Sequence, residues 1–154
     1  PSVAVVEGIA TAGGLQLVAA CDLALATPEA RVCLPGITNG GFCSTPAGAV
    51  ARNIGRKAVM EMALTGQVMD AEWATGVGLF NRVVHPDVLW DEVEALTALI
   101  AKGTPNAVGR GKVTLYQQLE MPLDAAYARA TDVMIGHFMD PERIEKEKAS
   151  RFSQ

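Results

Sequence analysis

The 154-residue chain is 49% hydrophobic and carries a formal net charge of −4 at pH 7. This composition is typical of one folded domain with a substantial core, and not of a disordered segment. The acidic balance disfavours nucleic-acid binding, and the absence of any long apolar run disfavours a membrane-spanning role.

The first fifty residues are predicted to alternate strands with one helix. Gly13 and Gly14 stand between an apolar run and a helical one, and Pro28 ends a later apolar run. An order of strand, glycine turn, helix and strand is typical of an α/β fold. The expected strands are residues 3–6, 22–27 and 32–34, and the expected helix is residues 15–21.

The remaining residues are predicted to be mainly helical. A loop with three glycines is expected over residues 36–46, and a short strand over residues 81–84. Gly66 suits the position just after a helix, whereas Asp70 and Pro105 suit helix starts. The expected helices are residues 47–52, 56–64, 71–74, 87–102, 105–119, 123–138 and 141–150.

Three cysteines and two histidines bear on metal and redox chemistry. Cys21, Cys33 and Cys43 form no CxxC pair, and the histidines are His85 and His137. A zinc site is therefore not expected, and we interpret the cysteines as buried free thiols in a reducing compartment. No signal-peptide pattern is visible, so we expect a cytoplasmic protein, with targeting left open because the sequence does not begin with Met.

The glycine pair has a chemical interpretation and a structural one. Glycines let a ligand approach the backbone closely. The first N–H groups of the helix that follows have no partner within it and carry the positive end of its dipole. Such a turn can bind a phosphate or stabilise a developing oxyanion. The alternative is a tight packing turn between a strand and a helix.

The residues around this pair resemble the crotonase (enoyl-CoA hydratase/isomerase) family. That family reads V-x-G-x-A-x-G-G-G-x-E-L and then x-C-D, and this chain reads VEGIATAGGLQL at residues 6–17 and ACD at residues 20–22. A second block, AEWATGVGLFNRVV at residues 71–84, is similar to the family's A-x-x-A-x-x-x-G-L-V-x-x-V-V. Pro35, Gly40 and the LTG segment at residues 64–66 extend the resemblance over nearly the whole chain.

The resemblance implies a fold, a substrate and an assembly. Residues 1–66 would be the second half of a crotonase-like spiral of ββα units, and residues 67–154 a helical region for trimerisation and CoA contact. An acyl-CoA thioester would bind with its carbonyl between two backbone N–H groups, one of them from Gly13. CoA enters as part of the substrate, so no separate cofactor is expected. The expected partners are a homotrimer or hexamer and the N-terminal half of the fold, which carries the second N–H donor.

Both acid/base groups that a hydratase of this family uses are replaced. One family glutamate falls two residues after the glycine run, where this chain has Gln16, and the other falls at Gly36. Hydration needs one carboxylate to activate water and another to deliver a proton. A carboxamide does not titrate near neutral pH, although Gln16 can hydrogen-bond to a water or an acyl group. Gly36 has no side chain and is expected to widen the pocket.

The glycine-rich loop is the remaining place to seek reactive groups. Some relatives, the dienoyl-CoA isomerases, carry an aspartate at the position of Ser44, but no partner that would activate this serine is evident. No cause for a lowered thiol pKa is evident at Cys43 either. We therefore expect Phe42, Cys43 and Ser44 to line the pocket. This stretch, with Gln16 and Gly36, resembles the enoyl-CoA hydratase domain-containing branch of the family.

The charged C-terminus resembles the family's ending E-K-R-K-x-x-F, in which a lysine approaches the CoA phosphates. Lys148 is the best match in position and Lys146 the next, and the alternative is a solvated charged helix. Three functional hypotheses follow. The first is an enzyme that stabilises a thioester enolate with a proton shuttle other than the two glutamates. The second is a non-catalytic acyl-CoA-binding pseudoenzyme, and the third is a structural or interaction domain.

Overall fold

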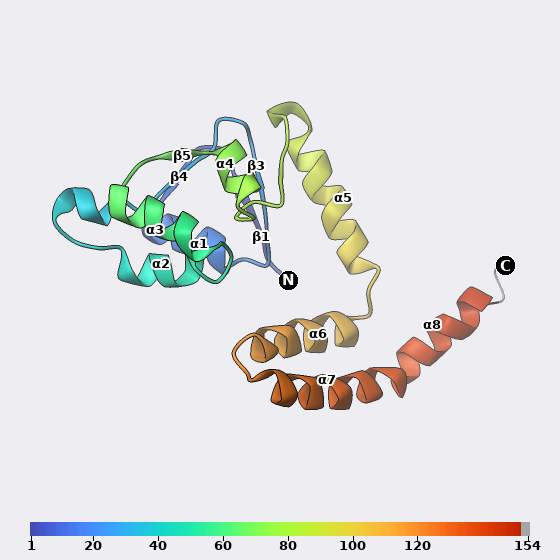
Figure 1. The fold of residues 1–154 in the computed structure, drawn as a ribbon. Helices are drawn as coiled ribbons and strands as arrows, with labels where there is room; N and C mark the ends of the chain where they lie inside the picture. Colours follow the sequence, from blue (N-terminus) through green and yellow to red (C-terminus); the bar gives the residue numbers. More distant parts are fainter. Residues whose placement is uncertain (152–154) are drawn as a thin grey trace. The chain divides into compact units, whose positions relative to one another are not determined.

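A computed structural model describes residues 1–151, with side chains as far as residue 150. The chain forms two compact units, Ser2–Ala95 and a helical unit that starts at Leu96. Figure 1 shows the order of the elements, with the strands confined to the first unit.

The strands of the first unit form two small sheets. In one sheet β3 (Leu23–Ala26) lies between β1 (Val3–Val6) and β6 (Arg82–Val83), and all three strands are parallel. In the other sheet β4 (Arg31–Cys33) lies between β2 (Ile9–Thr11), to which it is parallel, and β5 (Met69–Asp70), to which it is antiparallel. Mostly parallel strands joined through helices make this unit an α/β structure.

Local sequence signals account for most helix boundaries of the first unit. Asp70 caps one helix by accepting a 2.8 Å hydrogen bond from the Trp73 N–H. Gly66 ends another in the left-handed conformation, with φ 65°. The elements are α1 (Gly13–Ala20), η1 (Pro35–Asn39), α2 (Ser44–Val50), α3 (Arg56–Thr65), α4 (Ala71–Gly76), η2 (Pro86–Val88) and the start of α5 (Leu89–Ala101).

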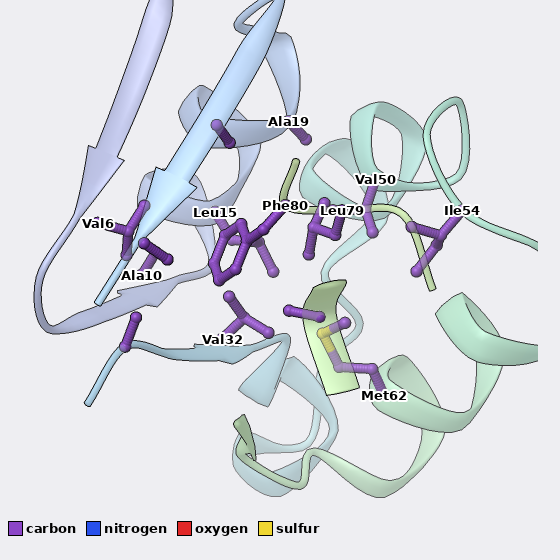
Figure 2. Close-up of a cluster of buried hydrophobic side chains, with 14 of the residues drawn as sticks. Val6, Ala10, Leu15, Ala19, Val32, Val50, Ile54, Met62, Leu79 and Phe80 are labelled. Carbon is purple, nitrogen blue, oxygen red and sulfur yellow. The ribbon is translucent and has the colours of Figure 1, made fainter. Parts of the chain in front are cut away.

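One hydrophobic core holds α1 in place against its sheet. Leu15 of α1, Val32 of β4 and Met62 of α3 are fully buried, and Figure 2 shows them with Phe80 and other core side chains. Burying one side chain of this size stabilises a fold by about 1.5–3 kcal/mol. Burial of Leu15, two residues after Gly13, therefore anchors the start of α1 in the core.

The second unit consists of the end of α5 and three helices: α6 (Pro105–Gln118), α7 (Leu123–Phe138) and α8 (Pro141–Arg151). Asp140 connects two of them, because it caps α8 through the Glu142 N–H at 2.9 Å and accepts a hydrogen bond from Asn106 of α6. The Asn106 bond is the main reason that the pKa of the Asp140 carboxyl is lowered. None of the helices described in either unit has both the length and the apolar character required to cross a bilayer.

The predicted elements are largely confirmed, with four differences. The strands β2 and β5 were not predicted, because two or three residues are too few for a periodic pattern. Part of the expected 36–46 loop is helical: η1 occupies its start, and α2 begins at Ser44 because Pro46 is tolerated in a first helical turn. The expected 87–102 helix begins two residues later, after η2. By packing, residues 67–95 belong with the core rather than with the later helices.

Candidate functional site

The glycine turn and the glycine-rich loop leave the same edge of one sheet. In the parallel pair β2–β4, Thr11 is the partner of Cys33, and each is the last residue of its strand. The Ala12 N–H extends this pairing by donating to the Cys33 carbonyl at 3.1 Å. Residues 12–14 and 34–36 therefore start side by side at the carboxyl ends of the two strands, where α/β folds commonly bind ligands.

Gly13 begins α1 with its backbone donor free of any partner within the helix. The first i to i−4 bond of this helix runs from the Gln16 N–H to the Ala12 carbonyl at 2.9 Å, so the N–H groups of Gly13, Gly14 and Leu15 precede it. Both glycines are exposed, neither has a positive φ, and a Cβ added to either would meet nothing within 4 Å. Neither packing nor backbone conformation within the described chain thus requires glycine at these two positions.

Ala12, just before the turn, has a strained backbone. Its φ of 46° and ψ of −115° make it the one non-glycine residue with positive φ among those the structure describes. Such conformations cost of order 1–3 kcal/mol and persist where the surroundings over-determine them. Here the bond to Cys33 on one side and the buried Leu15 on the other hold the residue. This backbone conformation of Ala12 sets the direction in which α1 starts.

Replacing Ala12 with glycine is expected to stabilise the protein by about 1 kcal/mol, because relief of the strain exceeds the extra entropy of an unfolded glycine. Urea unfolding of the full-length protein measures the change. Ala20→Gly is the matched control, since Ala20 is exposed at the end of the same helix, and it is expected to cost about 0.5–1 kcal/mol. Equal destabilisation by both changes would contradict the strain.

Gln16 lies one turn beyond Gly13 on α1 and is half-buried. Its side chain makes no hydrogen bond to any residue that the structure describes. The carboxamide is therefore available to a water or an acyl group, and its role in the site remains a prediction.

Gly36 does not widen a pocket, contrary to the sequence-based expectation. A Cβ at this position would lie 2.7 Å from the Cys43 nitrogen, 2.9 Å from the Phe42 carbonyl carbon and 3.0 Å from the Cys43 sulfur. The volume that a side chain would need is thus occupied by the returning loop. Two bonds fasten this loop: the Gly41 N–H donates to the Gly36 carbonyl at 3.0 Å, and the Gly36 N–H donates to Cys43 Sγ at 3.2 Å.

Two of the three thiols are close to the turn. Cys33 is buried and its thiol donates to the Gly66 carbonyl at 3.3 Å. Burial raises the pKa of the Cys33 thiol, the nearby Cys43 thiol raises it further, and a hydrogen bond with Thr11 opposes both effects. Cys21 and Cys43 are also free but only half-buried, contrary to the expectation that all three thiols are buried. Cys33 is consequently a protonated core thiol, and Cys43 is the one that lies at the loop surface.

The other expected site residues are divided between the units. Phe42 is 44% exposed and Ser44 is exposed as well, so both lie at the surface of the loop. The Phe42 carbonyl accepts a hydrogen bond from the Ser44 N–H at 2.8 Å. Lys148 lies on α8 in the second unit, where its Nζ is 2.8 Å from Glu145 Oε1 in an exposed ion pair. Such surface pairs contribute little to stability, so the lysine is available for another anion, but its contact with CoA remains a prediction.

Sequence reasoning missed the strain at Ala12 and the closure of the loop on Gly36. Ala12 stands where the family has the first glycine of its run, and this departure was a signal for the strain. No local pattern signalled the loop closure, since it depends on Gly36 and Cys43, which are seven residues apart in an irregular segment. Within the described part of the chain, no group of three His, Cys, Asp or Glu side chains is placed to hold a metal ion.

Comparisons with known proteins agree on one family. A family model described as "Enoyl-CoA hydratase/isomerase" matches residues 1–153. The mitochondrial "Enoyl-CoA hydratase domain-containing protein 3" of Rattus norvegicus is 42% identical over 135 residues, which are 88% of this chain and 45% of that protein. The chain thus spans about half the length of the curated relatives that it matches first.

Solved structures give the same result. A structure of enoyl-CoA hydratase from Mycobacterium smegmatis matches with a TM-score of 0.96 and 47% identity, over 100% of this chain and 60% of that one. An enoyl-CoA hydratase/isomerase family protein from Silicibacter pomeroyi matches with a TM-score of 0.89 and 57% identity, over 92% of this chain and 61% of that one.

Proposed function

The chain belongs to the enoyl-CoA hydratase/isomerase family, in the enoyl-CoA hydratase domain-containing branch, and we propose that the full-length protein binds an acyl-CoA thioester and stabilises its enolate. The observation that carries this proposal is the exposed start of α1. There the Gly13 N–H has no partner within the helix, and the residue itself is exposed. A thioester oxygen placed there would accept a hydrogen bond at the positive end of the helix dipole.

The proposed chemistry is reversible removal of a proton from the α-carbon of the thioester. A base takes the proton, the C–H electron pair forms the enolate, and the negative charge develops on the oxygen near Gly13. Pre-oriented backbone donors lower the energy of that charge without reorganising during the reaction. Neither Gln16 nor Gly36 can serve as the base, so the proton acceptor is a group other than the two family glutamates.

The second candidate is a pseudoenzyme that binds acyl-CoA without transforming it. The observation in its favour is the loop closure at Gly36, which leaves no ionisable side chain at one of the two acid/base positions. The enzyme and the pseudoenzyme would both bind acyl-CoA at the Gly13 turn. They differ only in whether the bound thioester is transformed.

Two measurements on the full-length protein separate the candidates. Calorimetry with a non-hydrolysable ketone analogue of butyryl-CoA, in which a CH₂ group replaces the thioester sulfur and the carbonyl oxygen is kept, tests binding. Free CoA is the control for contacts to the nucleotide alone. NMR in D₂O tests whether the protein accelerates exchange of the α-protons of butyryl-CoA. Binding with exchange supports the enzyme, and binding without exchange supports the pseudoenzyme. If the analogue does not bind, both candidates fail and only the third hypothesis, a structural or interaction domain, remains.

We propose a homotrimer or a hexamer as the assembly, with α5 and α7 in the interface. Trp90 and Leu99 of α5 are 59% and 61% exposed, and Leu123 and Tyr127 of α7 are 73% and 66% exposed. Exposed apolar side chains one helical turn apart, as Leu123 and Tyr127 are on α7, are typical of an interaction face.

Light scattering of the full-length protein is expected to give a trimer or a hexamer. Leu123→Lys is expected to shift it toward smaller species, because a buried lysine would be unpaired in the interface. Ala125→Lys is the control for adding a charge, because Ala125 is exposed on α7 but lies two residues from Leu123, on the opposite side of the helix. A monodisperse monomer of the unaltered protein would refute the assembly.

The compartment is a separate question. The cytoplasmic location expected from the sequence remains a prediction, and the relative from Rattus norvegicus is named as mitochondrial. Imaging of the full-length protein in its own cells distinguishes the two locations.

A further inference from the structure

Gly36 holds the returning loop through three features at once. Its carbonyl accepts the Gly41 N–H, its N–H donates to Cys43 Sγ, and its missing side chain leaves the space that the Phe42–Cys43 peptide fills. The closest approach, 2.7 Å to a backbone nitrogen, is below the range that a real Cβ adopts, and backbone atoms cannot rotate away as a side chain can. The loop and a side chain at residue 36 therefore exclude each other.

The position of this loop relative to the turn follows from the sheet. Residue 36 stands three residues after Cys33, whose carbonyl accepts the Ala12 N–H, and the Cys43 thiol is close enough to Cys33 to raise its pKa. The Phe42–Cys43 segment is thus near the start of α1. Its side chains are an exposed aromatic ring and a half-buried thiol, neither of which is a carboxylate.

We infer that Gly36 is a positioning residue, and that the Phe42–Cys43 segment which it holds forms the acyl-side wall of the site in the place of an acid/base side chain. The first part stands on the contacts of Gly36 alone. The second part rests on the proposed function, because a wall beside Gly13 matters only if the thioester binds there. The acid/base position is accordingly filled, and replacing residue 36 alone displaces the loop instead of adding a usable carboxylate.

The rate at which Cys43 reacts with a thiol reagent reports loop closure independently of any substrate. In Gly36→Ala the added methyl group forces the loop away, and the labelling rate of Cys43 is expected to rise at least about fivefold, as follows from typical overpacking penalties. Mass spectrometry assigns the label to Cys43 rather than to Cys21, and Cys43→Ser gives the background.

Gly41→Ala is the matched control from the same loop. A Cβ at Gly41 would make an ordinary 3.7 Å contact with the Gly36 carbonyl oxygen, and its φ is not positive. Cys43 in this variant is expected to label at the rate of the unaltered protein. A rate for Gly36→Ala that equals the rate for Gly41→Ala would overturn the inference.

Hydrogen exchange of the unaltered full-length protein keeps the inference testable if Gly36→Ala does not fold. The Gly41 amide is bonded to the Gly36 carbonyl, whereas the Phe42 amide has no acceptor among the described residues. Closure predicts slower exchange at Gly41 than at Phe42. Equal, rapid exchange at both amides would contradict it.

A final experiment tests whether the Phe42–Cys43 segment forms the acyl-side wall of the site. The ketone analogue of butyryl-CoA is expected to slow Cys43 labelling in the unaltered protein, because a bound acyl group would cover the segment. Normal analogue binding without protection of Cys43 would overturn the wall and leave the proposed function standing. Absence of analogue binding, with labelling that still responds to Gly36→Ala, would instead defeat the proposed function and leave the closure intact.

Discussion

The full-length protein is expected to hydrate crotonyl-CoA at least about 10³-fold more slowly than a standard short-chain hydratase. Each general acid or base contributes typically 10²–10⁴-fold to such a reaction. Gln16 cannot accept a proton near neutral pH, and the space at Gly36 is filled by the Phe42–Cys43 peptide. Loss of two such groups leaves orientation and backbone hydrogen bonds as the remaining contributions.

The decrease in the absorbance of the conjugated thioester measures this rate, with a standard hydratase assayed in parallel at the same pH. Evidence of normal folding and of analogue binding is needed beside it, so that a low rate reports missing chemistry and not a damaged sample. A rate within tenfold of the standard hydratase would show that another pair of groups performs the acid/base work.

Restoring the glutamates refines this first prediction. Gln16→Glu introduces a carboxylate on a half-buried position of α1, where no packing conflict is expected, and some hydration should return if the pocket orients the substrate. The double variant with Gly36→Glu is expected to be no faster than Gln16→Glu alone, because the second side chain must expel the loop. A double variant at least tenfold faster than the single one would contradict the closure.

Gly13→Pro is expected to lower the rate of α-proton exchange in butyryl-CoA by roughly 10²–10³-fold, the usual effect of removing one oxyanion donor. Proline has no N–H, so the donor at the start of α1 is lost. Proline is acceptable at the first position of a helix, but Ala12 before it cannot keep a ψ of −115°, so the turn is distorted as well. Affinity for the ketone analogue is expected to fall in parallel, because its carbonyl oxygen loses the same donor.

Gly14→Ala is the control for Gly13→Pro. Its added methyl group meets nothing within 4 Å and its N–H is retained, so exchange and binding should stay close to those of the unaltered protein. Circular dichroism and the thermal midpoint check that both variants fold. If the unaltered protein shows no exchange, analogue affinity becomes the readout. Unchanged affinity in a folded Gly13→Pro protein would remove Gly13 from the binding site.

Local chemistry made much of this protein predictable from its sequence. The caps at Asp70 and Gly66 and the proline at Pro105 act within one helical turn, so the helices that they bound were placed within a residue or two. The run of apolar residues around Gly13–Gly14 identified the strand, turn and helix that carry the candidate donor. The resemblance to one family rested on these same contiguous residues, and the comparisons confirm it.

Tertiary structure decided how separate segments meet at the site. The β2–β4 pairing brings Ala12 to the Cys33 carbonyl across 21 residues of chain, and no local pattern contains that partner (33 − 12 = 21). The positive φ of Ala12 follows from being held on both sides, against the preference of an alanine. Glycine at residue 36 looked like an emptied catalytic position, and the folded chain shows it as the point where the loop closes. Propensities and periodicity describe a residue's neighbours in sequence, whereas volume is shared among neighbours in space.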